Sequence, residues 1–336
     1  MKNAYIYPNV YVDDNPYLQD FVKSLASGYR FLNLKKPGCL GILSAFIFMR
    51  KADIMFFNWI EDLPDKRGGR LQTYAFLFIL NMLKRRKIKV FYTLHNRESH
   101  YPTNKKLKEK LFNTILQKAD YILSHSSEGA EILIKKNIPL EKFLYLPHPF
   151  NTVKVTSREK DKRFDILIWG ALKPYKGIDS YLKYLESQNL LNKYKTRIVG
   201  KIYPADYEKE LMRFKSDSID IQNRYIDDDK LNDMIDKSRI VLFTYKESSV
   251  LSSGALIYTL GRGANVIGPD TAAFSDLGKE GLLKTYDTYP EMIDRIDEVL
   301  KNPFSSEEKI NEYITENSWK NLGNRICCWI GDFSRS

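Results

Sequence analysis

Cysteine is scarce in this chain of 336 residues: there are three, and two of them, Cys327 and Cys328, are adjacent. Adjacent cysteines rarely pair, so the sequence predicts no disulfide framework and favours the reducing cytoplasm. The chain also lacks an uninterrupted apolar run of the roughly 18 to 20 residues that a membrane-spanning helix needs. Its first residues, MKNAYIYPNVY, lack the charged, apolar and small-residue order of a signal peptide. We therefore expect a protein that is soluble or that only touches a membrane.

Acidic residues are scarce in the first half of the chain. Residues 1–150 hold 24 Lys and Arg against 13 Asp and Glu, whereas residues 151–336 hold 29 of each. The whole net charge of +11 therefore falls in the first half. Such a half attracts an anionic partner, which can be a nucleic acid, a phospholipid surface or a phosphorylated substrate.

Short β-rich runs alternate with longer amphipathic segments along the whole chain, a pattern that predicts α/β units with mostly parallel sheets. Strands are expected at 4–7, 29–34, 52–59, 88–95, 119–125 and 143–148, and again at 164–170, 195–200, 218–226, 238–245, 264–269 and 282–286. The predicted organisation is a Rossmann-like domain at 1–150, a polar linker at 151–163, a second Rossmann-like domain at 164–310 and a helical tail at 311–336. The apolar face of the tail is expected to return to the first domain.

The segment ILIWGALKPYKGIDSYLKYL predicts an anion site. A strand ends at Gly170, a short loop carries Lys173 and Lys176, and Gly177 precedes a helix. The first turn of a helix offers unpaired N–H groups and a positive dipole end, to which the lysines add charge. The order Lys-Gly differs from the Gly-Lys-Ser/Thr of a P-loop. The alternative is an ordinary loop with solvated lysines.

The segment YKESSVLSSGALIYTLGRG predicts a second anion site. Glu247 follows a strand, and Ser252, Ser253 and Gly254 begin a helix with small side chains and free N–H donors. A carboxylate beside such a loop suits sugar hydroxyls better than phosphate. The alternative is a serine N-cap on a core helix. Gly200 ends another strand, where a flat ring could lie against the backbone.

The segment LHNRESH follows a strand and contains two of the four histidines, His95 and His100, with Glu98 between them. An imidazole there could bond a substrate hydroxyl, and Glu98 could act as a base. The helical HExxH pattern of zinc enzymes is absent. The alternative for His95 is a histidine that only caps a loop.

The segment YIDDDK contains three consecutive aspartates, Asp227 to Asp229, which could hold Mg²⁺ or Mn²⁺. We favour the other interpretation, in which they cap the helix that follows.

Two apolar segments of the first half end in cations. They are CLGILSAFIFMRK, at 39–51, and LQTYAFLFILNMLKRRKIK, at 71–89. Apolar helices with terminal cations can dock at an anionic membrane interface. The alternative is that both are core helices. We expect docking by some part of the first domain.

Together these segments resemble glycosyltransferases of the GT-B fold, close to family 4 and its bacterial polysaccharide relatives. WGALKPYKGID resembles the Lys-Gly signature, whose lysine contacts the donor diphosphate, here Lys176. YKESSVLSSGALIYTLGRGANVIGP resembles the donor block, whose leading glutamate, here Glu247, binds the donor. FFNWIEDLP, YTLHNRESH and YPNVYVDDNPYLQDF look like first-domain segments of enzymes that extend lipid-linked glycans.

The chain departs from that family at two positions. Ala171 stands where an arginine often follows the strand-end glycine, and Lys173 could replace its charge. The usual second glutamate, eight residues after the first, falls at Ala255, so the ribose contact is absent or replaced.

The resemblance implies two Rossmann-like domains facing a central cleft and a metal-independent transfer of a sugar from a nucleoside diphosphate donor to a hydroxyl of a glycan. No metal or cofactor is expected. The acceptor is expected to be lipid-linked and the enzyme to be peripheral at the inner face of a bacterial membrane. Two alternatives remain, a GT-B nucleotide-sugar epimerase and a nucleic-acid-binding protein, although two strand-end anion loops in the neutral half argue against nucleic acid.

The resemblance also assigns roles to residues. The donor is expected to meet Gly170, Lys173, Lys176, Gly200, Glu247, Ser252, Ser253 and Gly254. The catalytic candidates are His95, Glu247 and Glu98. The acceptor side is expected to include Asp13, Asp14, Asn15, Asn58 and His100, and Asp13 or Asp14 is an alternative base to Glu98 if the reaction inverts.

Overall fold

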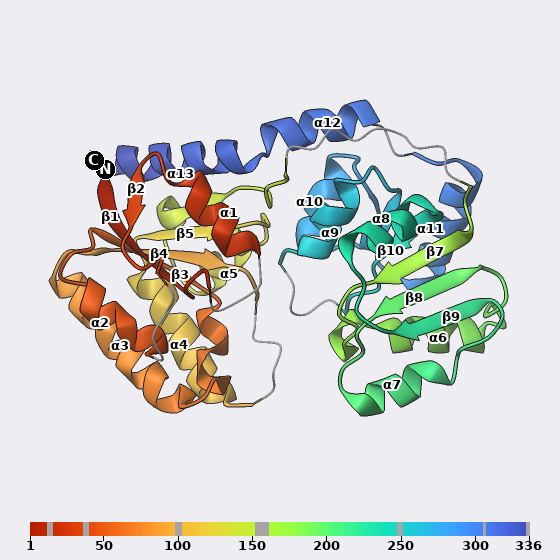
Figure 1. The fold of residues 1–336 in the computed structure, drawn as a ribbon, viewed down its shortest axis with the longest axis horizontal. Helices are drawn as coiled ribbons and strands as arrows, with labels where there is room; N and C mark the ends of the chain where they lie inside the picture. The colour runs from red at the N-terminus through yellow and green to blue at the C-terminus, as the bar shows by residue number, and fades with distance from the viewer. Residues whose placement is uncertain are drawn as a thin grey trace. The chain divides into compact units, whose positions relative to one another are not determined.

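The computed structural model describes residues 1–11, 16–35, 40–97, 103–151, 161–246, 251–304 and 307–333. The chain divides into two compact units (Figure 1). Unit 1 comprises Met1–Pro149, Ser249–Leu251 and Asn317–Ser336, and unit 2 comprises Phe150–Ser248 and Ser252–Glu316. Within the described ranges, no helix combines the length and the apolar composition that crossing a bilayer requires.

The sheet of unit 1 consists of six described strands in the order β2-β1-β3-β4-β5-β6, all paired in parallel. The strands are β1 (Lys2–Tyr7), β2 (Tyr29–Phe31), β3 (Ile54–Asn58), β4 (Lys89–Leu94), β5 (Tyr121–Ser124) and β6 (Phe143–Tyr145). Every residue of β3 is buried, as expected for a parallel strand that is covered on both faces.

One face of this sheet is covered by α1 (Pro16–Ser24) and α13 (Trp319–Phe333), which belong to the two ends of the chain (Figure 1). Leu322, Ile326 and Ile330 of α13 join the α1 side chains in one buried cluster. Gly323 lets the two helices approach closely, because a Cβ there would lie 2.0 Å from the carbonyl oxygen of Ser24. The tail helix therefore belongs to the core of unit 1, as the sequence predicted.

The other face carries the helices that connect β2 through β6 (Figure 1). They are η1 (Gly41–Leu43), α2 (Ser44–Phe48), η2 (Ile60–Asp65), α3 (Gly69–Arg85), α4 (Lys105–Lys118), α5 (Gly129–Lys135) and η3 (Leu140–Lys142). Phe76 of α3 packs on Phe57 of β3, with ring centres 4.9 Å apart. All these helices cross over between parallel strands, and such crossover connections are right-handed in nearly all proteins.

The sheet of unit 2 is built in the same way, with described strands in the order β12-β11-β10-β7-β8-β9. They are β7 (Phe164–Trp169), β8 (Thr196–Gly200), β9 (Ile219–Asn223), β10 (Ser238–Leu242), β11 (Val266–Pro269) and β12 (Lys284–Tyr286). Their pairing is parallel throughout. The strand order reverses between β7 and β10, and ligands bind at the carboxyl edge of such a switch point.

Helices cover both faces of the unit 2 sheet (Figure 1). One buried cluster joins the sheet to α6 (Ile178–Ser187), α7 (Ala205–Met212) and α11 (Tyr289–Lys301). The opposite face carries α8 (Asp228–Asp236), α9 (Gly254–Leu260) and α10 (Ala272–Lys279), and α12 (Glu307–Glu316) follows α11. A short 3-10 turn, η4 (Pro174–Lys176), precedes α6.

The structure confirms all twelve predicted strands and the predicted α/β class. It also confirms the capping interpretation of the first aspartate in YIDDDK. Asp227 is the N-cap of α8, and its Oδ1 accepts a hydrogen bond of 2.9 Å from the backbone N–H of Lys230. Asp228 and Asp229 lie in the first turn of the same helix, where carboxylates complement the helix dipole.

Candidate functional site

Lys176 is a buried cation at the carboxyl edge of the unit 2 sheet. Its side chain is 5% exposed. Its Nζ donates a hydrogen bond of 3.4 Å to the carbonyl oxygen of Trp169 and lies 5.4 Å from the centre of the Tyr245 ring. No carboxylate in the described ranges pairs with it, and burial, with a contribution from Lys173, lowers the pKa of its ammonium. A buried charge without a counter-charge is costly, so this position calls for an anion.

Two glycines shape the backbone around this lysine. Gly170, at φ +102°, leaves room for the lysine, because a Cβ there would lie 3.0 Å from Nζ of Lys176. Gly200, at φ +151°, meets Gly170 directly: a Cβ on Gly200 would lie 1.8 Å from the carbonyl oxygen of Gly170. This glycine therefore serves a close contact between two strand ends, and its predicted contact with a flat ring of the donor stays a prediction.

The loop after β10 is bonded to the Lys176 turn. Oγ1 of Thr244 donates to the carbonyl oxygen of Lys176 at 2.6 Å, and the backbone N–H of Lys246 donates to the carbonyl oxygen of Tyr175 at 3.0 Å. Gly177, at φ +68°, permits this approach, since a Cβ there would lie 2.4 Å from the carbonyl oxygen of Thr244. The two loops that the sequence selected as anion sites therefore form one structure.

Tyr245 connects Lys176 to the start of α9. Its hydroxyl lies 3.2 Å from Oγ of Ser253. Ser253 is the N-cap of α9, and its side chain accepts a hydrogen bond from the backbone N–H of Leu256. Ser252 differs, because its Oγ is buried and has no partner in the described part of the chain. Gly254 is exposed, and a Cβ there would meet nothing within 4 Å. The capping alternative is thus correct for Ser253, while Ser252 retains an unused hydroxyl.

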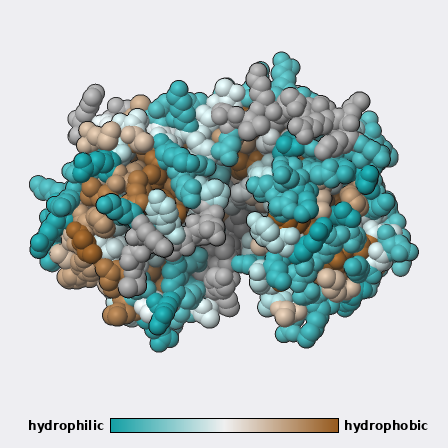
Figure 2. Space-filling model, viewed as in Figure 1, coloured by the Kyte–Doolittle hydropathy of each residue, from teal (hydrophilic) through white to brown (hydrophobic). Residues whose placement is uncertain are grey.

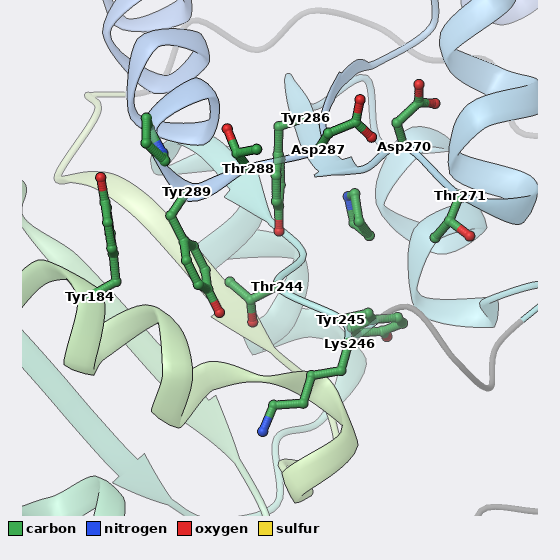
Figure 3. Close-up of a pocket in the computed structure, with 12 residues that line it drawn as sticks. Tyr184, Thr244, Tyr245, Lys246, Asp270, Thr271, Tyr286, Asp287, Thr288 and Tyr289 are labelled. Carbon is green, nitrogen blue, oxygen red and sulfur yellow. The ribbon is translucent and has the colours of Figure 1, made fainter.

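A cavity of about 500 Å³ adjoins this loop (Figure 3). It is formed by residues that follow three neighbouring strands: Thr244, Tyr245 and Lys246 after β10, Asp270 and Thr271 after β11, and Asp287 and Thr288 after β12. The rings of Tyr184, Tyr286 and Tyr289 stand along its wall in Figure 3. Aromatic faces with carboxylates and hydroxyls suit carbohydrate hydroxyl groups. Sequence reasoning did not assign these residues to a site, and only those that follow β10, β11 and β12 share a signal, which is their place after strands.

Ala171 and Ala255 are the two positions at which the sequence departs from the glycosyltransferase pattern. Ala171 is exposed, and the half-buried Lys173, two residues further on, is the neighbouring cation. Ala255 lies in the first turn of α9. Later in that helix, Oγ1 of Thr259 accepts a hydrogen bond of 3.0 Å from the indole N–H of Trp169.

His95 lies directly after β4 in unit 1, and its tautomer follows from its partners. Nδ2 of Asn58 donates to the carbonyl oxygen of Tyr7 at 3.4 Å, which turns Oδ1 of Asn58 toward Nε2 of His95 at 3.0 Å. Nε2 therefore carries the hydrogen and Nδ1 is the acceptor. Burial, then the neighbouring His125 and His148, hold the pKa of His95 well below its usual range. The imidazole is neutral and can accept a hydrogen bond from a hydroxyl.

The ring of His95 is held by aromatic side chains. It stacks on Trp59 with ring centres 4.2 Å apart, and its centre lies 4.9 Å from that of Tyr17. The hydroxyl of Tyr17 donates to Nε2 of His125 at 2.7 Å, because Nδ1 of His125 donates to the carbonyl oxygen of Leu146. Burial lowers the pKa of His125 to about 3. This aromatic cluster positions His95, and sequence reasoning missed it because its members come from distant segments.

Glu61 is a buried carboxylate beside the same strand ends, and sequence reasoning missed it as well. It is 3% exposed, and its oxygens accept hydrogen bonds from Nδ2 of Asn96 at 2.9 Å and from the hydroxyl of Tyr92 at 3.2 Å. Burial raises its pKa to about 7. Glu61 thereby holds the residue that follows His95. Asn58, which we expected on the acceptor side, is fully buried against His95 and orients it.

Several predicted site residues lie outside the described ranges. They are Asp13, Asp14, Asn15, Glu98, His100 and Glu247. Their roles remain predictions from the sequence.

No protein-family model and no curated protein sequence matches this chain. Solved structures do match. HepE from Anabaena, solved with UDP-glucose, superposes with a TM-score of 0.71 at 13% identity, covering 99% of this chain and 100% of that one. The chain has the GT-B fold.

Two other GT-B structures support the same conclusion. Sucrose-phosphate synthase from Thermosynechococcus elongatus gives a TM-score of 0.70 at 12% identity, with 100% of both chains covered. The lipopolysaccharide outer core galactosyltransferase WaaB gives 0.66 at 16% identity, again with 100% of both chains covered. In the GT-B fold of this chain, Lys176 lies at the carboxyl edge of one sheet and His95 at that of the other.

Proposed function

We propose that this protein is a glycosyltransferase that moves a sugar from a nucleoside diphosphate sugar to a hydroxyl of a glycan acceptor. The observation that carries the proposal is the buried ammonium of Lys176, for which the described residues provide no carboxylate. A diphosphate supplies the missing negative charge. The GT-B fold, shared with enzymes such as HepE and WaaB, supports sugar transfer over other uses of a diphosphate site.

Lys176 and Ser252 have the chemistry that the departing nucleotide needs. When the bond to the sugar breaks, negative charge grows on the diphosphate, and donors that are already oriented stabilise it without reorganising. The ammonium of Lys176 is held by Trp169 and Tyr245. The unused hydroxyl of Ser252 can donate one hydrogen bond. Because these groups supply charge and hydrogen bonds, we propose that the reaction requires no metal.

His95 is proposed to contact the transferred sugar. A neutral imidazole with Nδ1 as acceptor can take a hydrogen bond from a sugar hydroxyl without adding a charge to the site. Glu247 is proposed, from the sequence resemblance alone, to bind the donor sugar or ribose. Glu98, Asp13 and Asp14 remain the proposed bases if the reaction inverts the sugar.

The acceptor is proposed to be a lipid-linked glycan at the inner face of the cell membrane, in the synthesis of a cell-surface polysaccharide. The cationic first half of the chain supports this proposal, because such acceptors carry phosphate and lie at an anionic surface. UDP-sugars are the first donors to test, since HepE binds UDP-glucose.

The test is transfer of a labelled sugar. Purified protein is incubated with UDP-, GDP-, ADP- or dTDP-linked radioactive sugars and a lipid extract of membranes, with and without EDTA. We expect the label to enter the organic phase with one donor class, with or without EDTA. Release of an isomerised nucleotide sugar without acceptor would instead indicate an epimerase. No transfer and no isomerisation, in protein that binds random duplex DNA tightly, would contradict the proposal.

A further inference from the structure

Unit 1 exposes an apolar surface over its η1, α2 and α3 segments. Figure 2 shows hydrophobic side chains gathered on the α2 and α3 side of this unit. The exposed fractions are 46% for Leu40, 59% for Ile47, 72% for Leu71, 57% for Tyr74 and 55% for Phe78. We call these five residues the apolar face. Contiguous exposed apolar surface of this kind marks an interaction site.

The α3 helix is apolar on two sides. Residues 71–83 contain no charged side chain. Phe76, Ile79, Leu80 and Leu83 point into the core, whereas Leu71, Tyr74 and Phe78, spaced three and four apart, form a stripe toward solvent. Phe46 of α2 lies 6.2 Å from Phe78 between ring centres and continues the apolar face toward Ile47. A core helix needs one apolar side, so packing within unit 1 explains the buried side of α3 but not the apolar stripe toward solvent.

Cations surround the apolar face. Arg50 and Lys51 follow α2, Lys66, Arg67 and Arg70 stand at the start of α3, and Lys84, Arg85, Arg86 and Lys87 stand at its end. Nζ of Lys110, on α4, lies 5.8 Å from the centre of the Tyr74 ring. Lys84 pairs with Asp120 at 2.7 Å, whereas in the described part of the chain no carboxylate forms an ion pair with Arg50, Lys51, Arg67 or Arg85. Positive charge at this rim therefore stays available to an anionic partner.

We propose that the apolar face docks on an anionic phospholipid bilayer. Leu71, Tyr74, Phe78 and Ile47 enter the level of the headgroups, and the surrounding arginines and lysines contact lipid phosphates. Apolar side chains beside cations that follow α2 and stand at both ends of α3 match the acyl and headgroup levels of such an interface, whereas a protein partner would have to supply matching acidic groups. Docking would bring the protein to the surface that carries the proposed lipid-linked acceptor. It does not require sugar transfer, so the proposal of docking and the proposed function can fail separately.

The test is co-sedimentation of the full chain with vesicles of phosphatidylcholine, with or without about one third phosphatidylglycerol, at low and high salt. We expect binding that requires the anionic lipid and weakens with salt, because exposed charges are screened. The double variant Leu71→Ser with Phe78→Ser should lose about tenfold or more in affinity. The double variant Arg50→Glu with Arg85→Glu should lose a similar factor.

Unit 1 offers matched controls on other elements. Ile134 on α5 and Leu140 on η3 are 59% and 46% exposed, so Ile134→Ser with Leu140→Ser removes similar apolar surface and should leave binding unchanged. The control for the charge-reversal pair is Lys135→Glu with Lys136→Glu, which reverses two charges at the end of α5 and removes no apolar side chain. Absence of binding to any vesicle, or equal losses in both apolar pairs, would overturn the proposal. Dimerisation that Leu71→Ser with Phe78→Ser abolishes, without vesicle binding, would assign the surface to a second copy of the chain and also overturn it.

Discussion

The ammonium of Lys176 lies 5.4 Å from the centre of the Tyr245 ring, and the hydroxyl of that tyrosine lies 3.2 Å from Oγ of Ser253. One aromatic side chain therefore fixes both the cation and the beginning of α9. The face of an aromatic ring attracts a cation but does not neutralise it. Lys176 and Ser253 are thus both positioned by Tyr245, and in the proposed donor site the charge of Lys176 is left for the ligand to balance.

The first prediction concerns Lys176→Met, which keeps much of the side-chain volume and removes the charge. The melting temperature of the free protein should stay the same or rise, because a buried ammonium without a carboxylate costs stability. The kcat of sugar transfer should fall by about 10²- to 10³-fold, as when one preorganised donor is removed from an active site. Melting and initial-rate measurements check this, with Lys209→Met on the exposed side of α7 as control. A strongly destabilised variant would show that Lys176 is structural.

The second prediction separates two adjacent serines. Ser253→Ala should cost about 1 kcal/mol of unfolding free energy, because it removes the N-cap of α9. Ser252→Ala should leave stability within about 0.5 kcal/mol of the wild type, since its buried hydroxyl bonds no described residue. Donor affinity should nevertheless fall in Ser252→Ala. Urea unfolding and donor titration measure the two quantities, and a Ser252→Ala variant with unchanged donor affinity would remove this residue from the site.

The third prediction compares two glycines. Gly200→Ala should be destabilised by roughly 3 kcal/mol or more, because its Cβ would overlap the carbonyl oxygen of Gly170. Gly254→Ala has open space for the methyl group and should keep its stability. If a diphosphate approaches the start of α9, the same methyl group should weaken donor binding. Equal donor affinity in Gly254→Ala and wild type would place the donor elsewhere.

The strands could be predicted from the sequence because each is a short apolar run between polar segments. The Lys-Gly and Ser-Ser-Gly motifs could also be found, since each lies between the end of a strand and the start of the next helix. Local patterns cannot show which chain segments meet, so the sequence did not reveal that Tyr245 contacts both Lys176 and Ser253. For the same reason it missed Glu61, whose partners Tyr92 and Asn96 lie more than thirty residues away.

The fourth prediction concerns the protonation of His95. Its pKa lies well below the ordinary value of 6.5 because of burial, so at pH 6.5, where an ordinary histidine is half protonated, it should stay neutral with the hydrogen on Nε2. Long-range proton–nitrogen spectra of the histidine rings can check this, with assignment by His95→Gln. Asn58→Leu removes the acceptor of that hydrogen and should change the tautomer and lower kcat/KM. A charged imidazolium at pH 7 would contradict the assigned role.

The fifth prediction concerns Glu61, whose pKa is about 7 in the folded protein against an ordinary value of 4.5. Between these values the unfolded chain loses the proton while the folded protein keeps it, so this group lowers stability as pH rises from about 4.5 to 7. Glu61→Gln removes the effect. Its stability relative to the wild type should therefore grow over this interval by an amount of the order of 3 kcal/mol. Urea unfolding at several pH values measures it, and a difference independent of pH would show that Glu61 is ionised throughout.

Thermal denaturation with nucleotides tests the donor site most directly. Wild type and Lys176→Met are melted with UDP-, GDP-, ADP- and dTDP-sugars. Ligand at 100 times its dissociation constant stabilises a protein by about 2.7 kcal/mol, which is a measurable rise in melting temperature. The account predicts a rise with one nucleotide class in the wild type and none in Lys176→Met. A wild-type protein that is folded but gives flat melts with every nucleotide sugar, or a rise that persists in Lys176→Met, would contradict it.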